Sequence, residues 1–528
     1  MFRKRHAEHK QAGRGAIATM ASGCALMMGL AVLGLALAPG AGAAPIPSVP
    51  TTLPTFVGKV ANAQPIPPPG VPQNPFSAPN PFGSVHLDPW ESDTSTLAGP
   101  LGRAPLSWSS RLTQARRHPL LRLGHFFGCG TMLFDSHGRL EATCLGKGEA
   151  SLVLVAPVSL RVLAYMDLPI TRSVTGGSTA YFYLDSHDRA VIATARKHIW
   201  VVAQTGPAAH PRFSKVADYD LSQVGSGARD TLAAIAPDWR GRIWFVTHNA
   251  TVGVFDPAKY PAPDAIHQLA LASGEQVSNG PAVTPGAGYF VTSQKMYRVA
   301  AGADGRPQVV WSAPYQTIGK VKPGQYSLGS GTSPTILDHG RYVAIADNAN
   351  QLHVVVYRTA ARLAPGQLRT VCQTPVFPVG LGADENSLIG SGRSLIAVNT
   401  YGFKLLGLWL RLRSTRSEPG LARVDINANG NGCHEVWNNR KIEDIATPRL
   451  STKTGLVYVY ARRVDPNHPL RYVGYWTAVD FRTGKTIWQR LAGTGRRYDA
   501  YYPTVNIGPK GILYYSAFDG LVALRDTR

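Results

Sequence analysis

The stretch Thr477 to Arg490 reads TAVDFRTGKTIWQR and shows the pattern that decides the fold. An apolar strand ends at Asp480, the chain turns through threonine, glycine and lysine, and a second apolar strand closes on Trp488. Short runs of β-branched and aromatic residues between turn residues are typical of β-strands. Weaker copies of the pattern recur back to residue 130, so we predict an all-β fold built from a repeated unit.

The repeat has a period of about 50 residues, visible in the turn that precedes each apolar strand. The turn markers define eight units and are Gly138, Asp188, Gly241, Gly288, Gly340, Gly392, Gly455 and Gly511. Units of this length with four short strands are typical of β-propeller blades, which bury their faces by stacking around a channel. We therefore predict a single β-propeller over residues 87–528 with eight four-stranded blades, seven being the alternative.

Four of these turns share a sequence that starts with aspartate and ends with arginine. They are DSHGR at 135–139, DSHDR at 185–189, DWRGR at 238–242 and DHGR at 338–341. A repeated ligand site is one interpretation, but aspartate accepts local backbone N–H groups and glycine tolerates left-handed geometry, as hairpin turns require. We assign these residues to turns.

The end of each unit predicts how the blades pack and how the ring closes. PQVVW (307–311), LRTVC (368–372), CHEVW (433–437) and KTIWQ (485–489) occupy the same place in four units, and three of them end in or contain tryptophan. A tryptophan at this place packs one sheet against the next. The last unit stops at GLVALRD without such a strand, so we expect the segment from Trp90 to Leu123 to supply it and close the ring.

Two stretches resemble a known family. AVDFRTGKTIW is similar to the repeat A-x-D-x-x-T-G-K-x-x-W of eight-bladed propellers in the pyrroloquinoline quinone (PQQ) family, and SNGPAVTPGAGYFVTSQKMYRV resembles the strand before it. The resemblance covers about residues 130–528 and implies the architecture. It also implies PQQ with calcium as cofactors if an oxidoreductase activity is shared. Quinoprotein alcohol dehydrogenases carry adjacent cysteines beside the cofactor, and this chain has no such pair.

The N-terminal segment predicts export. A basic start, an apolar run from Ile17 to Ala38 and the small residues at 41–43 are typical of a signal peptide over residues 1–43, cleaved before Ala44. An uncleaved membrane anchor is the alternative, because the apolar run approaches the length of a membrane span. Residues 44–86 are rich in proline, with twelve between 45 and 82, and predict a stiff, disordered linker.

Charge and cysteines agree with an exported, soluble body. After cleavage the chain has a net charge of +18, but its arginines are scattered through turns, so we expect no nucleic-acid binding. Four cysteines remain, which favours two disulfides. A turn at Ser136 and His137 would set Cys129 opposite Cys144, at a bridgeable distance. That leaves Cys372 to pair with Cys433.

Candidate binding residues precede the innermost strands, where each blade opens onto the channel mouth. They are Asp230, Asn279, Thr332, Ser333, Glu385, Asn386, Asp444, Asp499 and Tyr501. Such oxygens could bind calcium or hydrogen-bond a polyol or sugar. Glu385 and Asp444 could also divide acid and base roles. The alternative is that these residues form turns and satisfy backbone groups.

Taken together, the sequence predicts an exported propeller, secreted or associated with the cell envelope. We expect it to be a monomer that binds a small molecule, a glycan or an envelope protein at its channel mouth without catalysing a reaction. The alternative function is that of a PQQ- and calcium-dependent oxidoreductase, or of a metal-assisted hydrolase of the propeller type.

Overall fold

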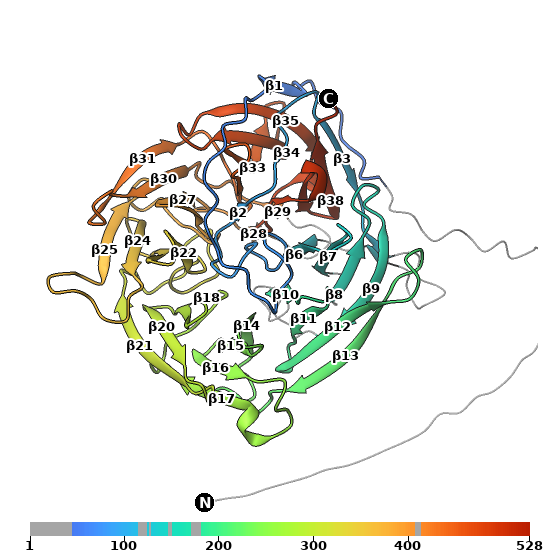
Figure 1. The fold of residues 1–528 in the computed structure, drawn as a ribbon. Coiled ribbons are helices and arrows are strands. Elements are labelled where there is room, and N and C mark those ends of the chain that lie inside the picture. Colours follow the sequence, from blue (N-terminus) through green and yellow to red (C-terminus); the bar gives the residue numbers. More distant parts are fainter. Residues whose placement is uncertain (1–44, 115–123, 126–127, 146–149, 170–180, 407–412) are drawn as a thin grey trace, which may run out of the picture. The chain divides into compact units, whose positions relative to one another are not determined.

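A computed structural model describes residues 45–114, 124–125, 128–145, 150–169, 181–406 and 413–528. Eight sheets stand around a common axis, each built on four antiparallel strands that run from the centre outward (Figure 1). The chain is therefore an eight-bladed β-propeller, as predicted. No helix in the described part of the chain is long and apolar enough to cross a membrane. The expected signal peptide, residues 1–43, lies outside the described residues.

The blades follow one another in chain order. Blades 1 and 2 contain β6 (Gly128–Phe134), β7 (Leu140–Leu145), β8 (Ala150–Val155) and β9 (Val162–Leu168), then β10 (Phe182–Leu184), β11 (Ala190–Ala193), β12 (His198–Thr205) and β13 (Arg212–Asp220). Blades 3 and 4 contain β14 (Leu232–Pro237), β15 (Ile243–Thr247), β16 (Thr251–Phe255) and β17 (Ile266–Ala270), then β18 (Ala282–Thr284), β19 (Ala287–Val291), β20 (Lys295–Ala301) and β21 (Pro307–Pro314).

The second half of the ring repeats this order. Blades 5 and 6 contain β22 (Thr335–Leu337), β23 (Tyr342–Ala346), β24 (His353–Arg358) and β25 (Thr370–Pro375), then β26 (Ile389–Ser391), β27 (Ser394–Val398), β30 (Leu421–Ile426) and β31 (Cys433–Asn439). Blades 7 and 8 contain β32 (Arg449–Ser451), β33 (Leu456–Asp465), β34 (His468–Asp480) and β35 (Thr486–Thr494), then β36 (Asn506–Ile507), β37 (Leu513–Ala517), β38 (Gly520–Arg525) and β3 (Leu106–Ser110).

Several short elements lie outside this pattern. They are β1 (Phe56–Gly58), β2 (Thr94–Ser95), β4 (Thr113–Gln114), β5 (Gly124–His125), β28 (Leu405–Leu406), β29 (Arg413–Ser414) and the 3-10 segments Pro263–Ala265, Arg496–Tyr498 and Pro509–Gly511. Strands β1 and β2 extend the sheet of blade 7 at its outer and inner edges.

The marker turns join the innermost strand of a blade to the second strand, which confirms the period inferred from the sequence. Seven of the eight markers lie between these two strands, and Gly288 lies at the start of β19. In the first turn the Asp135 carboxylate accepts the backbone N–H groups of His137 and Arg139 at 3.0 and 2.8 Å. Its other oxygen lies 2.8 Å from Nε of Arg139. The turns at 185–189 and 238–242 repeat these contacts, so their aspartate and arginine hold hairpins.

Tryptophans and one disulfide join neighbouring blades at the outer strands. The indole N–H of Trp311, in blade 4, donates to the Thr359 carbonyl beside blade 5, and that of Trp437, in blade 6, donates to Phe481 in blade 7. The Cys372–Cys433 disulfide links β25 of blade 5 to β31 of blade 6. Both predicted disulfides are present, and Cys129 stands opposite Cys144 in the β6–β7 register as expected.

The ring closes with a strand from the N-terminal part of the chain. Leu106–Ser110 forms β3 and pairs antiparallel with β38 as the outermost strand of blade 8. Asp526, just after β38, accepts the backbone N–H groups of Leu101, Gly102 and Arg103. The missing strand was thus correctly placed within residues 90–123.

The expectation of a disordered linker over 44–86 is wrong for the residues the structure describes. Residues 45–98, called here the N-terminal strap, lie against the propeller: β1 pairs with β35, and backbone N–H groups of Gln64 and Ile66 donate to Thr454 and Thr452. Ile46 and Ala78 are buried. The proline-rich composition makes an extended chain, and here the backbone groups of that chain pair with the blades instead of with water.

Candidate functional site

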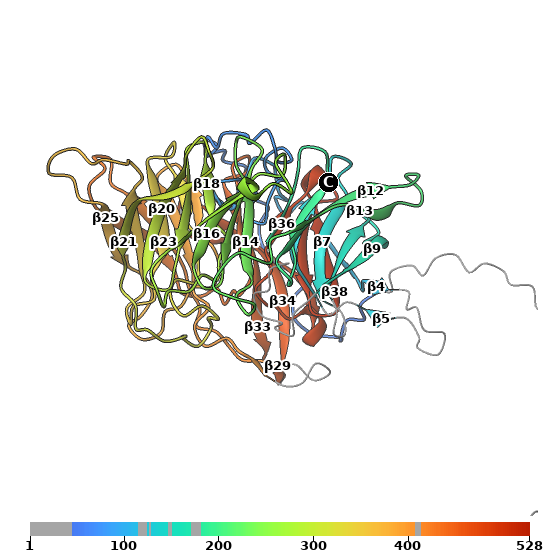
Figure 2. The same cartoon turned by 90° about the horizontal axis from the view of Figure 1, so that it is seen from below.

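The N-terminal strap covers the end of the ring at which the innermost strands finish (Figure 2). Its carbonyl groups accept hydrogen bonds from the innermost strands of blades 2, 4, 5 and 6: Gly83 from Leu184, Pro89 from Val283, Trp90 from Ile336 and Ser92 from Gly390. A Cβ added at Gly455 would lie 2.2 Å from the Gln64 carbonyl oxygen, so the strap passes directly over that marker turn. This end of the channel is therefore closed by the chain itself.

A buried ionic cluster fixes the strap in the centre. Asp93 forms an ion pair with Arg449 of β32 and lies 3.0 Å from Nδ1 of His86, and all three residues are buried. His86 Nε2 also lies 3.0 Å from the Ser387 hydroxyl of blade 6. Burial, followed by the charge of Arg449, lowers the pKa of His86 well below its usual value. The imidazole is therefore neutral at pH 7, and the Asp93–Arg449 pair supplies the charge attraction.

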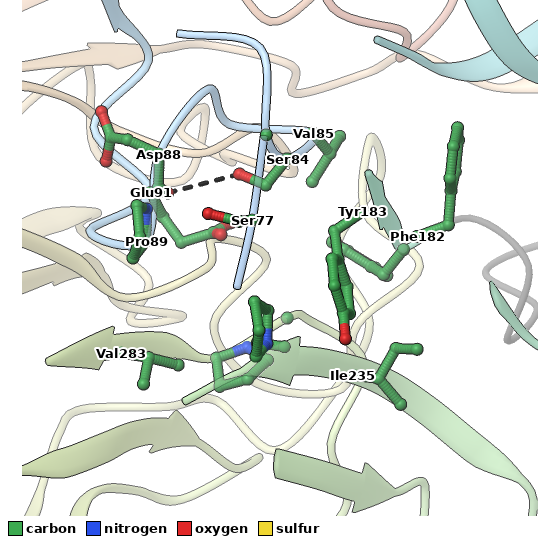
Figure 3. Close-up of a pocket in the computed structure, with 16 residues that line it drawn as sticks. Ser77, Ser84, Val85, Asp88, Pro89, Glu91, Phe182, Tyr183, Ile235 and Val283 are labelled. Atoms are coloured by element: carbon green, nitrogen blue, oxygen red, sulfur yellow. Dashed lines mark hydrogen bonds between the residues drawn. The ribbon is translucent and has the colours of Figure 1, made fainter. Parts of the chain in front are cut away.

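A small cavity of about 30 Å³ remains between the strap and blades 2 to 4 (Figure 3). Asp88, Glu91, Tyr183 and Ile235 are among its lining residues. Burial raises the pKa of Glu91 well above its usual value and that of Asp88 to about 6. A cavity of this size holds one or two water molecules.

The cavity under the strap does not fit PQQ. A tricyclic quinone with three carboxyl groups needs several times the space that the strap leaves, and the lining offers carboxyl groups rather than cations to meet its acids. In the part of the chain that the structure describes, no group of three or more His, Cys, Asp or Glu is arranged to hold a metal ion.

The nine predicted binding residues lie at the opposite end, where the innermost strands begin. The structure does not bring them together as one open ring of ligands, because most of them are buried and satisfy backbone groups nearby. Asp444, one of the nine, accepts the N–H group of Ala446, and Asp384, at the same place in blade 6, accepts that of Asn386, each 2.9 Å away and two residues on. These contacts are turn chemistry, the alternative that the sequence left open.

Two predicted asparagines connect neighbouring blades. Asn279 donates to the Ser330 and Thr332 carbonyls at 3.1 and 3.3 Å, and Asn386 donates to the Ile445 and Ala446 carbonyls at 2.9 and 3.2 Å. The first pair joins blade 4 to blade 5, and the second joins blade 6 to blade 7. Such hydrogen bonds hold the strand starts in register around the axis.

Four of the remaining predicted residues also have local partners. The carboxylate of Asp230 accepts the N–H groups of Ser226 and Asn249, and the Thr332 hydroxyl accepts that of Ala346. Asp499 lies 3.5 Å from Nε of Arg462, and the Tyr501 hydroxyl donates to the Cys129 carbonyl at 3.1 Å. Ser333 is buried.

Glu385 and Asp444 do not form the expected acid and base pair. Burial raises the pKa of Glu385 to about 8 and that of Asp444 well above its usual value, so burial shifts both carboxyl groups in the same direction. General acid and base roles require environments that separate the two pKa values. Glu385 is instead held by the Ser327 hydroxyl, which donates to it at 2.9 Å.

The open pocket at this end lies above Glu385 and has a volume of about 440 Å³, within the range of ligand sites. It forms where the loop before blade 5, the loop after β27 in blade 6 and the loop before blade 8 meet. Tyr326, Tyr502 and Phe403, one from each loop, form an edge-to-face series with ring centroids 5.1 and 5.2 Å apart. Tyr326 is the exposed member of the series.

Close backbone contacts shape this pocket. The Tyr502 hydroxyl donates to the Gly324 carbonyl at 3.1 Å, and the Thr400 hydroxyl donates to the same carbonyl at 2.8 Å. A Cβ at Gly324, where φ is +92°, would meet the Thr400 carbonyl oxygen at 1.9 Å. Glycine is therefore required for the loops of blades 5 and 6 to approach each other.

Two polar side chains complete the lining. Lys322 is buried and donates to the carbonyls of Ala349 and Gly382, and burial lowers its pKa to about 8. Gln325 donates to the Asp384 carbonyl at 3.1 Å, while its Oε1 has no hydrogen-bond partner among the described residues. The pocket thus combines aromatic faces with a lysine and an unused acceptor.

One feature of the sequence indicates this pocket, the length of the connection before blade 5. Residues 315–334, between β21 and β22, form a longer connection than residues 271–281 or 376–388 at the same place in other blades. Long connections in compact folds are often functional.

Comparisons with known proteins assign no activity to the chain. No family model matches the chain. It is 27% identical over 337 residues to an uncharacterized protein of Archaeoglobus fulgidus, and the match covers 58% of this chain and 63% of that protein, less than two thirds of its length.

Solved structures resemble the chain only distantly. A putative 6-phosphogluconolactonase from Bacteroides uniformis ATCC 8492 matches with a TM-score of 0.38 and 10% identity, over 70% of this chain and 99% of that one. A functionally unknown protein from Desulfotomaculum acetoxidans DSM 771 matches with a TM-score of 0.36 and 12% identity, over 72% and 99%.

Proposed function

We propose that the protein is a binding module whose ligand enters the pocket formed by Tyr326, Tyr502 and Phe403, and that it catalyses no reaction itself. The observation that carries this proposal is the pocket of about 440 Å³ at the one end of the ring that the N-terminal strap leaves uncovered. Concave, mostly apolar sites with a few placed polar groups are typical of ligand binding. Glu385 and Lys322 support the walls through local hydrogen bonds.

Export is part of the same proposal. Two disulfides are stable in an oxidising compartment, which supports a secreted or envelope-associated protein. Cleavage before Ala44 would leave a mature chain that begins two residues before Ile46, a residue packed against blades 7 and 8. N-terminal sequencing of the exported form tests this, and an N-terminus upstream of residue 40 would contradict it.

The binding site is tested with Tyr326→Ala against a matched control. A thermal-shift screen with defined oligosaccharides, amino acids and short synthetic peptides identifies binders, whose Kd is then measured by calorimetry. We expect at least tenfold weaker binding for Tyr326→Ala. Phe76→Ala should leave binding unchanged, because Phe76 is equally exposed but lies on the strap. Binders whose Kd is the same for Tyr326→Ala and the wild type would refute this location of the site.

A further inference from the structure

An exposed apolar surface adjoins the pocket. It consists of five side chains on the loops before blades 5 and 6: Ile318 (42% exposed), Val321 (50%), Tyr326 (43%), Val379 (64%) and Leu381 (39%). Single exposed apolar residues are ordinary, but a contiguous group marks an interaction site. We call this group, together with the pocket, the docking surface.

The docking surface is held rigid by backbone contacts to one turn of blade 5. The N–H group of Ile318 donates to the Asn348 carbonyl and that of Gly380 to the Asn350 carbonyl, both at 2.9 Å. Lys322 joins the same turn to the second loop through the carbonyls of Ala349 and Gly382. Both loops are therefore anchored to the same turn in a fixed arrangement, which lowers the entropy lost on binding.

Charge around the docking surface is positive. Lys320, Lys404 and Arg416 are exposed on the surrounding loops, where Glu418 is the exposed acid among the described residues. Glu385 beneath the pocket adds no charge at pH 7, because burial raises its pKa to about 8. Binding to this surface is therefore favoured for a partner that carries acidic groups around an apolar centre.

Building on the proposed function, we propose that the ligand of this site is a protein segment with a large apolar anchor residue flanked by acidic residues. The anchor enters the aromatic pocket, where Tyr326 and Tyr502 pack against it. Neighbouring apolar side chains of the segment cover Val379 and Leu381, and its carboxylates face Lys320 and Lys404. A large apolar anchor that fills a pocket near the centre of an interface is the usual arrangement of a binding hot spot.

Panning a phage-displayed random dodecapeptide library on the purified chain tests the inference. The enriched sequences should contain Phe, Leu or Trp flanked by Asp or Glu. A synthetic peptide of that sequence should bind at least tenfold more weakly to Val379→Asp and Lys404→Glu, and more weakly at high salt. Val309→Asp is the matched control, since Val309 is 44% exposed on β21, and it should bind like the wild type.

The outcomes separate this inference from the proposed function. Failure to enrich peptides, enrichment without acidic residues, or peptide binding that Val379→Asp and Lys404→Glu leave unchanged would each overturn the inference. If an oligosaccharide binds instead and Tyr326→Ala abolishes its binding, the pocket remains a ligand site and the inference about a protein partner is wrong. If Tyr326→Ala affects no binder of any class, both are wrong.

Discussion

Glu141 should make the free energy of unfolding fall as the pH rises from about 5 to 8. It is fully buried in β7, between blades 1 and 2, where Gln204 of β12 donates to its Oε1. Burial raises its pKa from 4.5 to about 8. The folded chain therefore keeps a proton that the unfolded chain releases near pH 4.5. The contribution to stability is complete below pH 4.5 and is lost as the pH approaches 8.

The size of this effect follows from the two pKa values. One proton held only by the folded state changes the free energy of unfolding by about 1.4 kcal/mol per pH unit. Between pH 5 and pH 7 the loss due to Glu141 is about 2.5 kcal/mol by the same relation. Asp88 and Glu385, with pKa values raised by burial to about 6 and 8, act in the same direction.

Glu141→Gln isolates the contribution of this residue. The amide keeps the shape and hydrogen-bonding capacity of the protonated acid but does not titrate. Urea unfolding at pH 5, 6, 7 and 8 should therefore show a shallower loss of stability in Glu141→Gln, by about 1.4 kcal/mol per pH unit. Glu418→Gln, at an exposed position, should follow the wild type. Parallel profiles for Glu141→Gln and the wild type would refute the reasoning.

Two further changes test what holds the ring. Replacing Cys372 and Cys433 together by serine should lower the free energy of unfolding by about 4 kcal/mol on the loop-entropy relation, since the disulfide spans 61 residues; an unchanged urea midpoint would contradict this. Asp93→Asn leaves the buried Arg449 unpaired and should destabilise by about 3–5 kcal/mol in the same assay. Asp304→Asn, at an exposed ion pair, is the control and should change the free energy of unfolding by less than about 0.5 kcal/mol. Equal effects of Asp93→Asn and Asp304→Asn would show that the buried Asp93–Arg449 pair does not hold the strap.

The repeat could be predicted because each blade carries its own local signals. Marker turns such as 135–139 need aspartate and glycine whatever the rest of the chain does, so they are visible in the sequence. The position of Cys129 opposite Cys144 followed from one turn length. Ring closure by an N-terminal strand could also be predicted, because the last repeat unit in the sequence lacks an outer strand.

The N-terminal strap could not be predicted, because no local pattern specifies it. Its hydrogen bonds are made mainly by backbone groups, such as the Trp90 carbonyl with the Ile336 N–H, and these leave no trace in side-chain periodicity. Proline-rich composition is compatible both with a free linker and with an extended chain laid on a surface. The pocket could not be predicted for a related reason: Tyr326, Phe403 and Tyr502 come from three loops that meet only in the folded ring.

Ring closure by β3 has a consequence for the order of folding. The partner of this strand, β38, lies more than 400 residues later in the chain and is made last. Contacts of such sequence separation form slowly, and blades 1 to 7 can complete their own four-stranded sheets while blade 8 cannot. During synthesis β3 therefore has an unpaired edge until β38 is made. This exposed edge is the part of the molecule that pairs most readily with strands of other chains or binds chaperones.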